Sequence, residues 1–123
     1  MSALLWVLQI VLALVFLPLG LLALGGSRER VLRVAPWVED FPEPVVRVVG
    51  VLEILGGLGV VLPAVLGVWT LLVPVAATGL GLLMIGVIVE HLMRGELNRI
   101  SAPAALLVAA TAVAIGRFGP WPL

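Results

Sequence analysis

The sequence predicts an all-α integral membrane protein, a bundle of four transmembrane helices that forms a single domain over residues 1–123. Hydrophobic residues make up 63% of the chain and charged residues only 11%, whereas a soluble domain carries about 25% charged residues. Uncharged stretches long enough to cross a bilayer recur along the chain. Charged residues gather in the short segments between these stretches, as in a compact membrane bundle.

Four apolar stretches form the predicted spans. The first, at residues 4–24, has no charge and lacks the basic residues that open a signal peptide, so we interpret it as a membrane helix. The uncharged run from Ile54 to Val89 is too long for one span, and Pro63 and Gly67 are the turn signals inside it. We therefore expect helices at about residues 4–24, 44–62, 68–91 and 101–117.

The segment at residues 27–43 is polar and rich in proline. Ser27 is placed to cap a short helix, and Trp37 and Phe41 are aromatic residues of the kind found at headgroup level. We expect an interfacial segment that lies on the bilayer surface. A plain polar connection and a lid over a cavity are the alternatives.

The tryptophans and arginines predict the orientation of the bundle. Four spans place both termini on one side together with Trp6, Trp69 and Trp121, and Trp37 on the other side, as an aromatic belt requires. Six of the seven arginines flank the long loop or the turn after the third helix, so the positive-inside rule puts the loop 27–43 in the cytoplasm and both termini outside. Arginine without lysine suggests a bacterial source, and we expect the bacterial inner (cytoplasmic) membrane.

The composition excludes several kinds of chemistry. The chain has no cysteine, which rules out disulfide exchange, thiolate ligation and covalent haem attachment within it. With His91 as the single histidine, a bis-histidine haem cannot form in one chain, and no ligands are grouped for zinc. A net charge of zero gives no reason to expect nucleic acid. We expect no metal, no intrinsic cofactor and no enzyme activity of the chain on its own.

Glu53 is the main candidate for a functional site. It lies about 13 Å from the start of the second predicted span, near the bilayer midplane, where an ionisable group is costly and marks a functional site. In one interpretation it hydrogen-bonds to Gln9, Thr78 or Thr111 and fixes the packing of the helices. In the other it contacts the polar group of a ligand or exchanges a proton with a quinone.

Other residues qualify as parts of the same site. Gly50 and Gly57 share a helix face with Glu53, and they either admit a neighbouring helix or leave room for a flat ligand. His91, near Arg47, either interacts with the helix dipole or anchors a ligand at the mouth of a cavity. Arg117 is expected to reach out to the interface. The ligand-binding candidates are Gln9, Arg47, Gly50, Glu53, Gly57, Thr78 and His91.

Several of these elements resemble those of a known family. Phe16-Leu-Pro-Leu-Gly20 is similar to its F-x-x-x-G element, and residues 50–63 contain its G-x-x-E-x-x-G signature followed by Leu-Pro. Residues 91–96 and the late Arg117 extend the match. The chain resembles the DoxX-like family of small four-helix membrane proteins over nearly its whole length. A lysine common in the family after the first glycine is absent, and Ala23 stands near that place.

We consider three functions, and the resemblance implies the first two. The family name comes from a subunit associated with a thiosulfate:quinone oxidoreductase, and other members are linked to membrane redox stress complexes, so an accessory protein that binds a small hydrophobic, quinone-like ligand at Glu53 is expected first. A eukaryotic relative is an assembly chaperone for ion-channel receptors, so an assembly factor that binds another membrane protein is the alternative. The third is a small transporter, working as a homo-oligomer, with Glu53 as its coupling site.

Overall fold

The computed structural model describes residues 1–123, and all of its regular structure is helical. Four segments are long and apolar enough to cross a membrane, which confirms the predicted four-helix membrane bundle. They are α1, α3 with the short α4, α5 and α6. The elements in chain order are α1 (Ser2–Gly25), α2 (Arg28–Val34), η1 (Pro36–Asp40), α3 (Glu43–Gly59), α4 (Leu62–Leu66), α5 (Leu72–Met93), η2 (Leu97–Arg99) and α6 (Ser101–Phe118).

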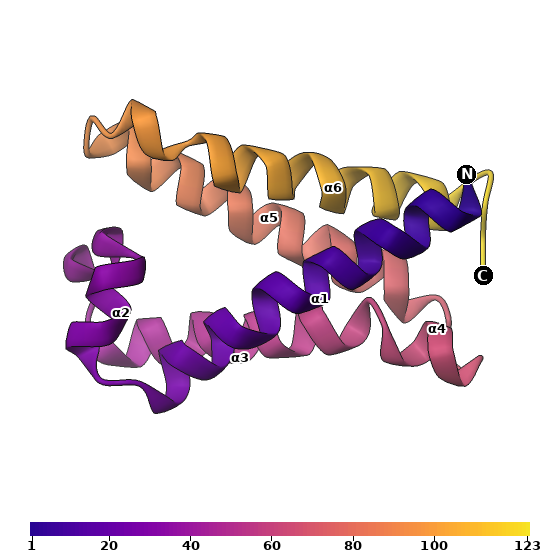
Figure 1. Cartoon of the computed structure of the whole chain (residues 1–123), viewed down its shortest axis with the longest axis horizontal. Helices are drawn as coiled ribbons and strands as arrows, with labels where there is room; N and C mark the ends of the chain where they lie inside the picture. Colours follow the sequence, from indigo (N-terminus) through magenta and orange to yellow (C-terminus); the bar gives the residue numbers. More distant parts are fainter.

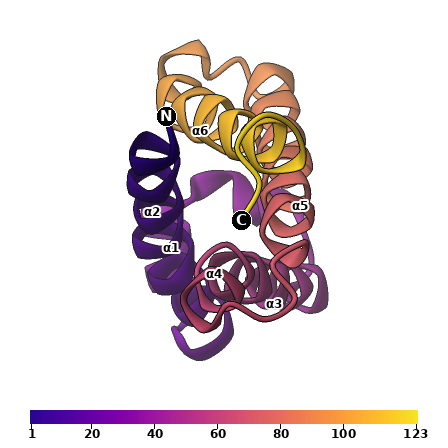
Figure 2. The ribbon, with the colours of Figure 1, turned by 90° about the vertical axis from the view of Figure 1, so that its right-hand side faces the viewer.

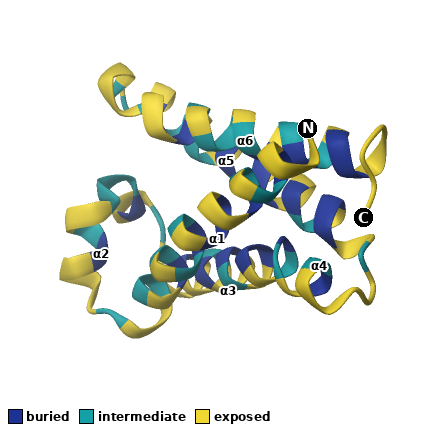
Figure 3. Ribbon diagram, turned by 45° about the vertical axis from the view of Figure 1, so that its right-hand side comes forward, coloured by how far each residue is buried: buried dark blue, intermediate teal, exposed yellow.

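The four spans form a ring in which each helix contacts two others (Figure 2). The pairs α1–α3 and α5–α6 have the most extensive contacts, and the pairs meet through α1–α6 and α3–α5. Both chain termini lie at one end of the bundle, here called the terminal end, and α2 lies at the other, the loop end (Figure 1). Buried residues face the interior, while the outer faces are exposed and largely apolar, as contact with lipid requires (Figure 3).

Glycines allow the closest approaches between helices. A Cβ added to Gly20 of α1 would lie 2.7 Å from the carbonyl oxygen of Gly50 in α3, so the two backbones are in contact there. A Cβ added to Gly116 of α6 would lie 2.6 Å from Leu5 Cδ1 of α1. In lipid, where helices gain little from the hydrophobic effect, such close contact is a main source of helix association.

The closest contacts between the two pairs lie toward the terminal end. Gly56 of α3 packs against Leu80 of α5, and a Cβ on Gly59 would lie 2.7 Å from Ala76. Beyond Gly56, toward the loop end, the ribbons of the two pairs diverge (Figure 1). The segment 27–43 lies at this diverging end.

The chain reverses later than the sequence predicts. α3 ends at Gly59, and Pro63 lies in the first turn of α4, where the missing N–H of proline costs no hydrogen bond. The reversal falls at Gly67, with φ 68°, and Trp69, with φ 52°. α5 consequently begins at Leu72 rather than at residue 68.

The segment 27–43 contains two short helices, α2 and η1. Val31 and Val38 form a small apolar cluster with Val46 of α3. Trp37 and Phe41 pack edge to face with ring centroids 5.6 Å apart. The segment is therefore docked on the bundle instead of being a plain connection.

Candidate functional site

Glu53 lies on the inner face of α3, in the middle of the span Glu43–Leu66. It is 8% exposed, and its Oε2 atom is buried without a hydrogen-bond partner. Leaving a buried acceptor unsatisfied costs about 1–3 kcal/mol. No other buried side-chain nitrogen or oxygen lacks a partner, which distinguishes Glu53 from every other polar residue of the bundle.

The glycines next to Glu53 define the direction in which it points. Gly50 and Gly57 face α1, whereas Gly56 faces α5. Successive residues of a helix are rotated by about 100°, so Glu53 falls between these two directions. Its side chain therefore enters the interior between α1 and α5.

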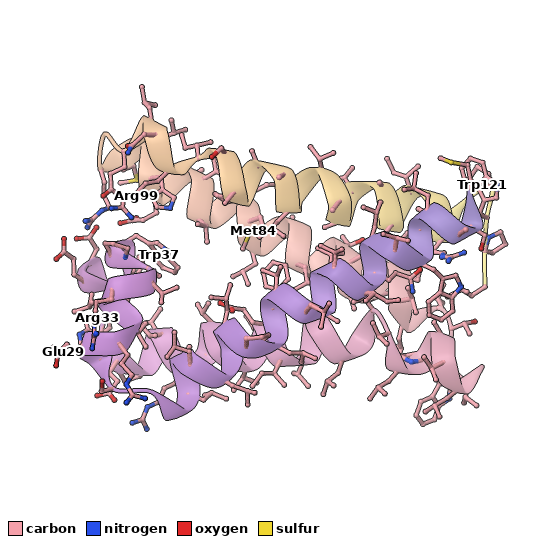
Figure 4. The ribbon with its side chains drawn as sticks, in the orientation of Figure 1. Glu29, Arg33, Trp37, Met84, Arg99 and Trp121 are labelled. Atoms are coloured by element: carbon pink, nitrogen blue, oxygen red, sulfur yellow. The ribbon has the colours of Figure 1, made fainter.

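Met84 of α5 lies level with Glu53 across the interior. Gly56 of α3 contacts Leu80 of α5, and the two helices are antiparallel. One turn closer to the loop end, α3 therefore carries Glu53 and α5 carries Met84 on the facing sides. Met84 is buried, and Figure 4 shows its side chain directed from α5 into the space between the helix pairs. A methionine side chain is flexible, so Met84 can change its conformation to make room for a ligand next to the carboxyl group of Glu53.

A groove of about 410 Å³ runs between α3 and α5 on the lipid-facing side. Its lining is mostly apolar and includes Gly56, Gly79 and Leu80. Glu53 is not part of this lining, and Gly56 and Leu80, which contact each other, lie one helical turn from Glu53 and Met84.

A separate network occupies the terminal end of the interior. Gln9 Nε2 donates to the carbonyl of Val60 at 2.7 Å, and Arg117 Nε donates to Gln9 Oε1 at 2.8 Å. Arg117 Nη1 donates to Ser2 Oγ and to the carbonyl of Trp121, both at 3.0 Å. The network thus joins both chain termini to the break between α3 and α4.

The polar residues expected around Glu53 have other partners. Gln9 belongs to the terminal-end network, and Thr78 Oγ1 donates to the carbonyl of Pro74 in its own helix at 2.8 Å. Thr78 and Thr111 line a small cavity between α5 and α6. Arg117, expected at the interface, is 3% exposed and points into the bundle.

A second polar cluster lies at the loop end, around Arg94. Its guanidinium group pairs with Glu39 at 2.8 Å, Asp40 at 2.9 Å and Glu96 at 2.9 Å. His91 Nδ1 lies 3.1 Å from the same Glu96 oxygen. Hydrogen bonds from Arg94 and His91 lower the pKa of Glu96, and the carboxylates of Glu96, Asp40 and Glu39 raise the pKa of Arg94. The charged cluster ties η1 to the end of α5.

Arg47 and His91 do not come together. Arg47 pairs with Glu43 at 2.8 Å on the surface, with 61% of its side chain exposed, whereas His91 is buried and lines a cavity that Arg47 does not reach. Gly50 and Gly57 contact α1, and their part in ligand binding stays a prediction. The sequence did not single out Arg94, although its place three residues after His91 was a usable signal.

No group of three or more His, Cys, Asp or Glu side chains is arranged to hold a metal ion. The arrangement defines a class, a four-helix integral membrane protein with a single unpaired carboxyl oxygen in its interior. A family model described as the DoxX-like family matches residues 7–113, a range that includes Glu53, and the chain belongs to this family. No curated protein and no solved structure matches the chain.

Proposed function

We propose that this protein binds a small hydrophobic molecule of the quinone type, with the polar head of that molecule at Glu53. The unpaired, buried Oε2 atom of Glu53 carries the proposal. A protonated carboxyl group donates a hydrogen bond to a quinone carbonyl, and a carboxylate accepts one from a quinol hydroxyl. Either bond removes the cost of a buried oxygen without a partner.

The groove between α3 and α5 supports a place for the apolar part of the ligand. Its volume of about 410 Å³ lies within the usual range of small-molecule sites, roughly 300–1,000 Å³. A Cβ on Gly79 would meet nothing within 4 Å, so the space next to this residue is open on the α5 side of the groove. A ligand dissolved in the bilayer can approach Glu53 from this side after a shift of the Leu80 side chain.

In this proposal the protein is an accessory of a membrane redox system. The ligand carries the electrons, and Glu53 supplies a hydrogen bond or a proton at the ligand head. The proposal places the chain in a bacterial inner membrane with residues 27–43 in the cytoplasm. Arginine asymmetry supports this orientation, because six arginines lie toward the loop end and the seventh, Arg117, is buried at the terminal end.

Mass spectrometry of small molecules extracted from the protein, purified in a mild detergent, tests the proposal. We expect wild-type protein to carry a quinone or a comparable apolar molecule, and Glu53→Leu to lose at least about tenfold in occupancy, since a buried hydrogen bond is lost. Glu43→Gln is the matched control, because it removes an exposed carboxylate that pairs with Arg47. An equal amount of ligand in wild type and Glu53→Leu, or none in wild type, contradicts the proposal.

A different observation favours assembly of membrane proteins as a second candidate function. Gly79 and Gly86 lie on the exposed side of α5, seven residues and therefore two turns apart, and a Cβ on either would meet nothing within 4 Å. Such glycines allow a helix of another protein, or of a second copy, to approach closely. In that case Gly86→Leu would release a co-purifying protein while Glu53→Leu would not.

A further inference from the structure

A cavity of about 320 Å³ at the loop end lies apart from Glu53 and from the groove. It is formed between η1 and the start of α6, and none of its lining residues is acidic. Figure 4 shows Trp37 and Arg99 at this end of the molecule. The lining residues that bear on its chemistry are Trp37, His91, Asn98, Arg99, Ser101 and Ala102.

Arg99 gives this cavity an available positive charge. Its side chain is 47% exposed, and its Nε atom lies 3.8 Å from Glu96 Oε2, beyond hydrogen-bond distance. Glu96 directs its other oxygen to Arg94 and His91 at 2.9 and 3.1 Å. Arg99 is therefore in a long ion pair with Glu96 but makes no hydrogen bond to it, and its guanidinium N–H groups remain available for charge-assisted hydrogen bonds to an anion.

The start of α6 adds hydrogen-bond donors to the same cavity. α6 begins at Ser101 without a side-chain cap. The N–H groups of Ser101 and Ala102 come before the first N–H that donates within the helix, that of Ala104 to Ile100, so the helix leaves them free. α6 has 18 residues, and the positive end of its dipole faces this point.

His91 indicates independently that the cavity receives a ligand. The residue is 6% exposed and lines the cavity, and its Nδ1 atom bonds to Glu96 Oε1. The low pKa of Glu96, caused by Arg94 and then His91, makes that oxygen an acceptor, so Nδ1 carries the hydrogen. The Nε2 atom makes no hydrogen bond within the protein, and it is not among the fully buried atoms, so it is accessible from the cavity although more than nine-tenths of the residue is buried.

We propose that this cavity binds an anionic phosphate group at the membrane surface, either a lipid phosphodiester headgroup or a soluble phosphate ester. Arg99 and the first N–H groups of α6 bind the phosphate oxygens, and His91 Nε2 accepts a hydrogen bond from a hydroxyl group of the ligand. Trp37 forms the apolar wall. Because η1 supplies this wall, the bound anion also holds the segment 27–43 against the ends of α5 and α6.

Two probes test the site and separate the two sources of phosphate. Native mass spectrometry measures retained lipid after reconstitution in equal amounts of phosphatidylglycerol and phosphatidylcholine, and calorimetry measures binding of glycerol 3-phosphate in detergent. We expect wild type to retain phosphatidylglycerol preferentially or to bind glycerol 3-phosphate, and Arg99→Gln to weaken that binding about tenfold or more. Arg30→Gln, which removes the same charge from an exposed position of α2, leaves binding unchanged.

A second variant keeps the test independent of charge. Ala102→Phe fills the cavity without changing the net charge and should reduce binding as much as Arg99→Gln does. Binding of the lipid alone identifies a headgroup site, and binding of glycerol 3-phosphate identifies a soluble ester. Equal losses in Arg30→Gln and Arg99→Gln, full binding in Ala102→Phe, or binding of neither probe by wild type overturns the proposal.

Discussion

At the scale of single residues, two polar side chains that look alike in the sequence have opposite environments. Gln9 and Glu53 each lie inside an apolar span. Gln9 is fully buried with both ends of its amide paired, whereas Glu53 Oε2 has no partner. The difference comes from the end of α3, because the carbonyl of Val60 lies at the break before α4 and accepts from Gln9.

Gln9→Leu should lower the free energy of unfolding by about 1–3 kcal/mol, because it leaves the Val60 carbonyl and Arg117 Nε buried without a partner. Reversible unfolding in mixed micelles measures this loss. Thr78→Val is the control and should change the free energy by less than about 0.5 kcal/mol, since its hydroxyl bonds only to its own helix. Equal effects of the two substitutions would show that the terminal-end network does not stabilise the bundle.

The sequence located the candidate site but not the partners of its residues. Hydropathy and spacing were sufficient to single out Glu53 and the glycines on its face, because a carboxylate in an apolar span is visible without a structure. The direction of Arg117 was not predictable, since an arginine near a helix end either reaches the interface or turns inward. Its actual acceptors, Ser2 and the carbonyl of Trp121, come from the two termini and carry no sequence signal.

At the scale of elements, Arg94 holds the segment 27–43 on the bundle by an electrostatic contact. It joins Glu39 and Asp40 of η1 to Glu96, which follows α5. Arg28 stiffens the same segment by donating to the carbonyl of Phe41 at 2.8 Å. The alternative in which the segment is a lid over a cavity stays a prediction.

Docking of this segment should weaken in acid. The pKa of Glu96 lies below its ordinary value of 4.5, because Arg94 and His91 favour the carboxylate in the folded protein. A carboxyl group whose pKa is lowered in the folded protein stabilises the fold at pH values above its ordinary pKa. This stabilisation is lost as the pH falls through the lowered pKa. The protection factors of the amides of residues 36–41, which correct for the intrinsic pH dependence of hydrogen exchange, should therefore stay constant from pH 7 to about 4.5 and fall below it.

Arg94→Gln should make the same amides exchange faster already at pH 7, because it removes all three ion pairs of Arg94. Arg47→Gln breaks only an exposed pair with Glu43 and should leave exchange at residues 36–41 unchanged. Slow exchange in Arg94→Gln at neutral pH would mean that the apolar contacts of Val31, Val38 and Val46 hold the segment without the ion pairs.

At the scale of the whole molecule, the number of spans was predictable and their arrangement was not. Length and hydropathy define four spans, and the tryptophans at both ends agree with them. The order of the helices around the ring depends on which faces of small residues pack together. α3, α5 and α6 each carry small residues at helical spacing, and such a pattern allows close packing against more than one neighbouring helix. The divergence of the two helix pairs arises from Gly56–Leu80 and Leu5–Gly116 contacts between residues far apart in the sequence.

The orientation of the whole bundle can be measured with introduced cysteines, because the chain has none of its own. A membrane-impermeant maleimide should label Leu123→Cys in intact cells and Arg30→Cys only after the membrane is permeabilised, since the arginines at the loop end favour the cytoplasm. Leu14→Cys, on the lipid-facing side of α1, should stay unlabelled in both conditions and serves as the control. The opposite pattern would reverse the proposed orientation. Three of the four spans lie between residues 30 and 123, which places these residues on opposite sides of the membrane. Labelling of Leu123→Cys and Arg30→Cys from the same side would therefore contradict the four spans.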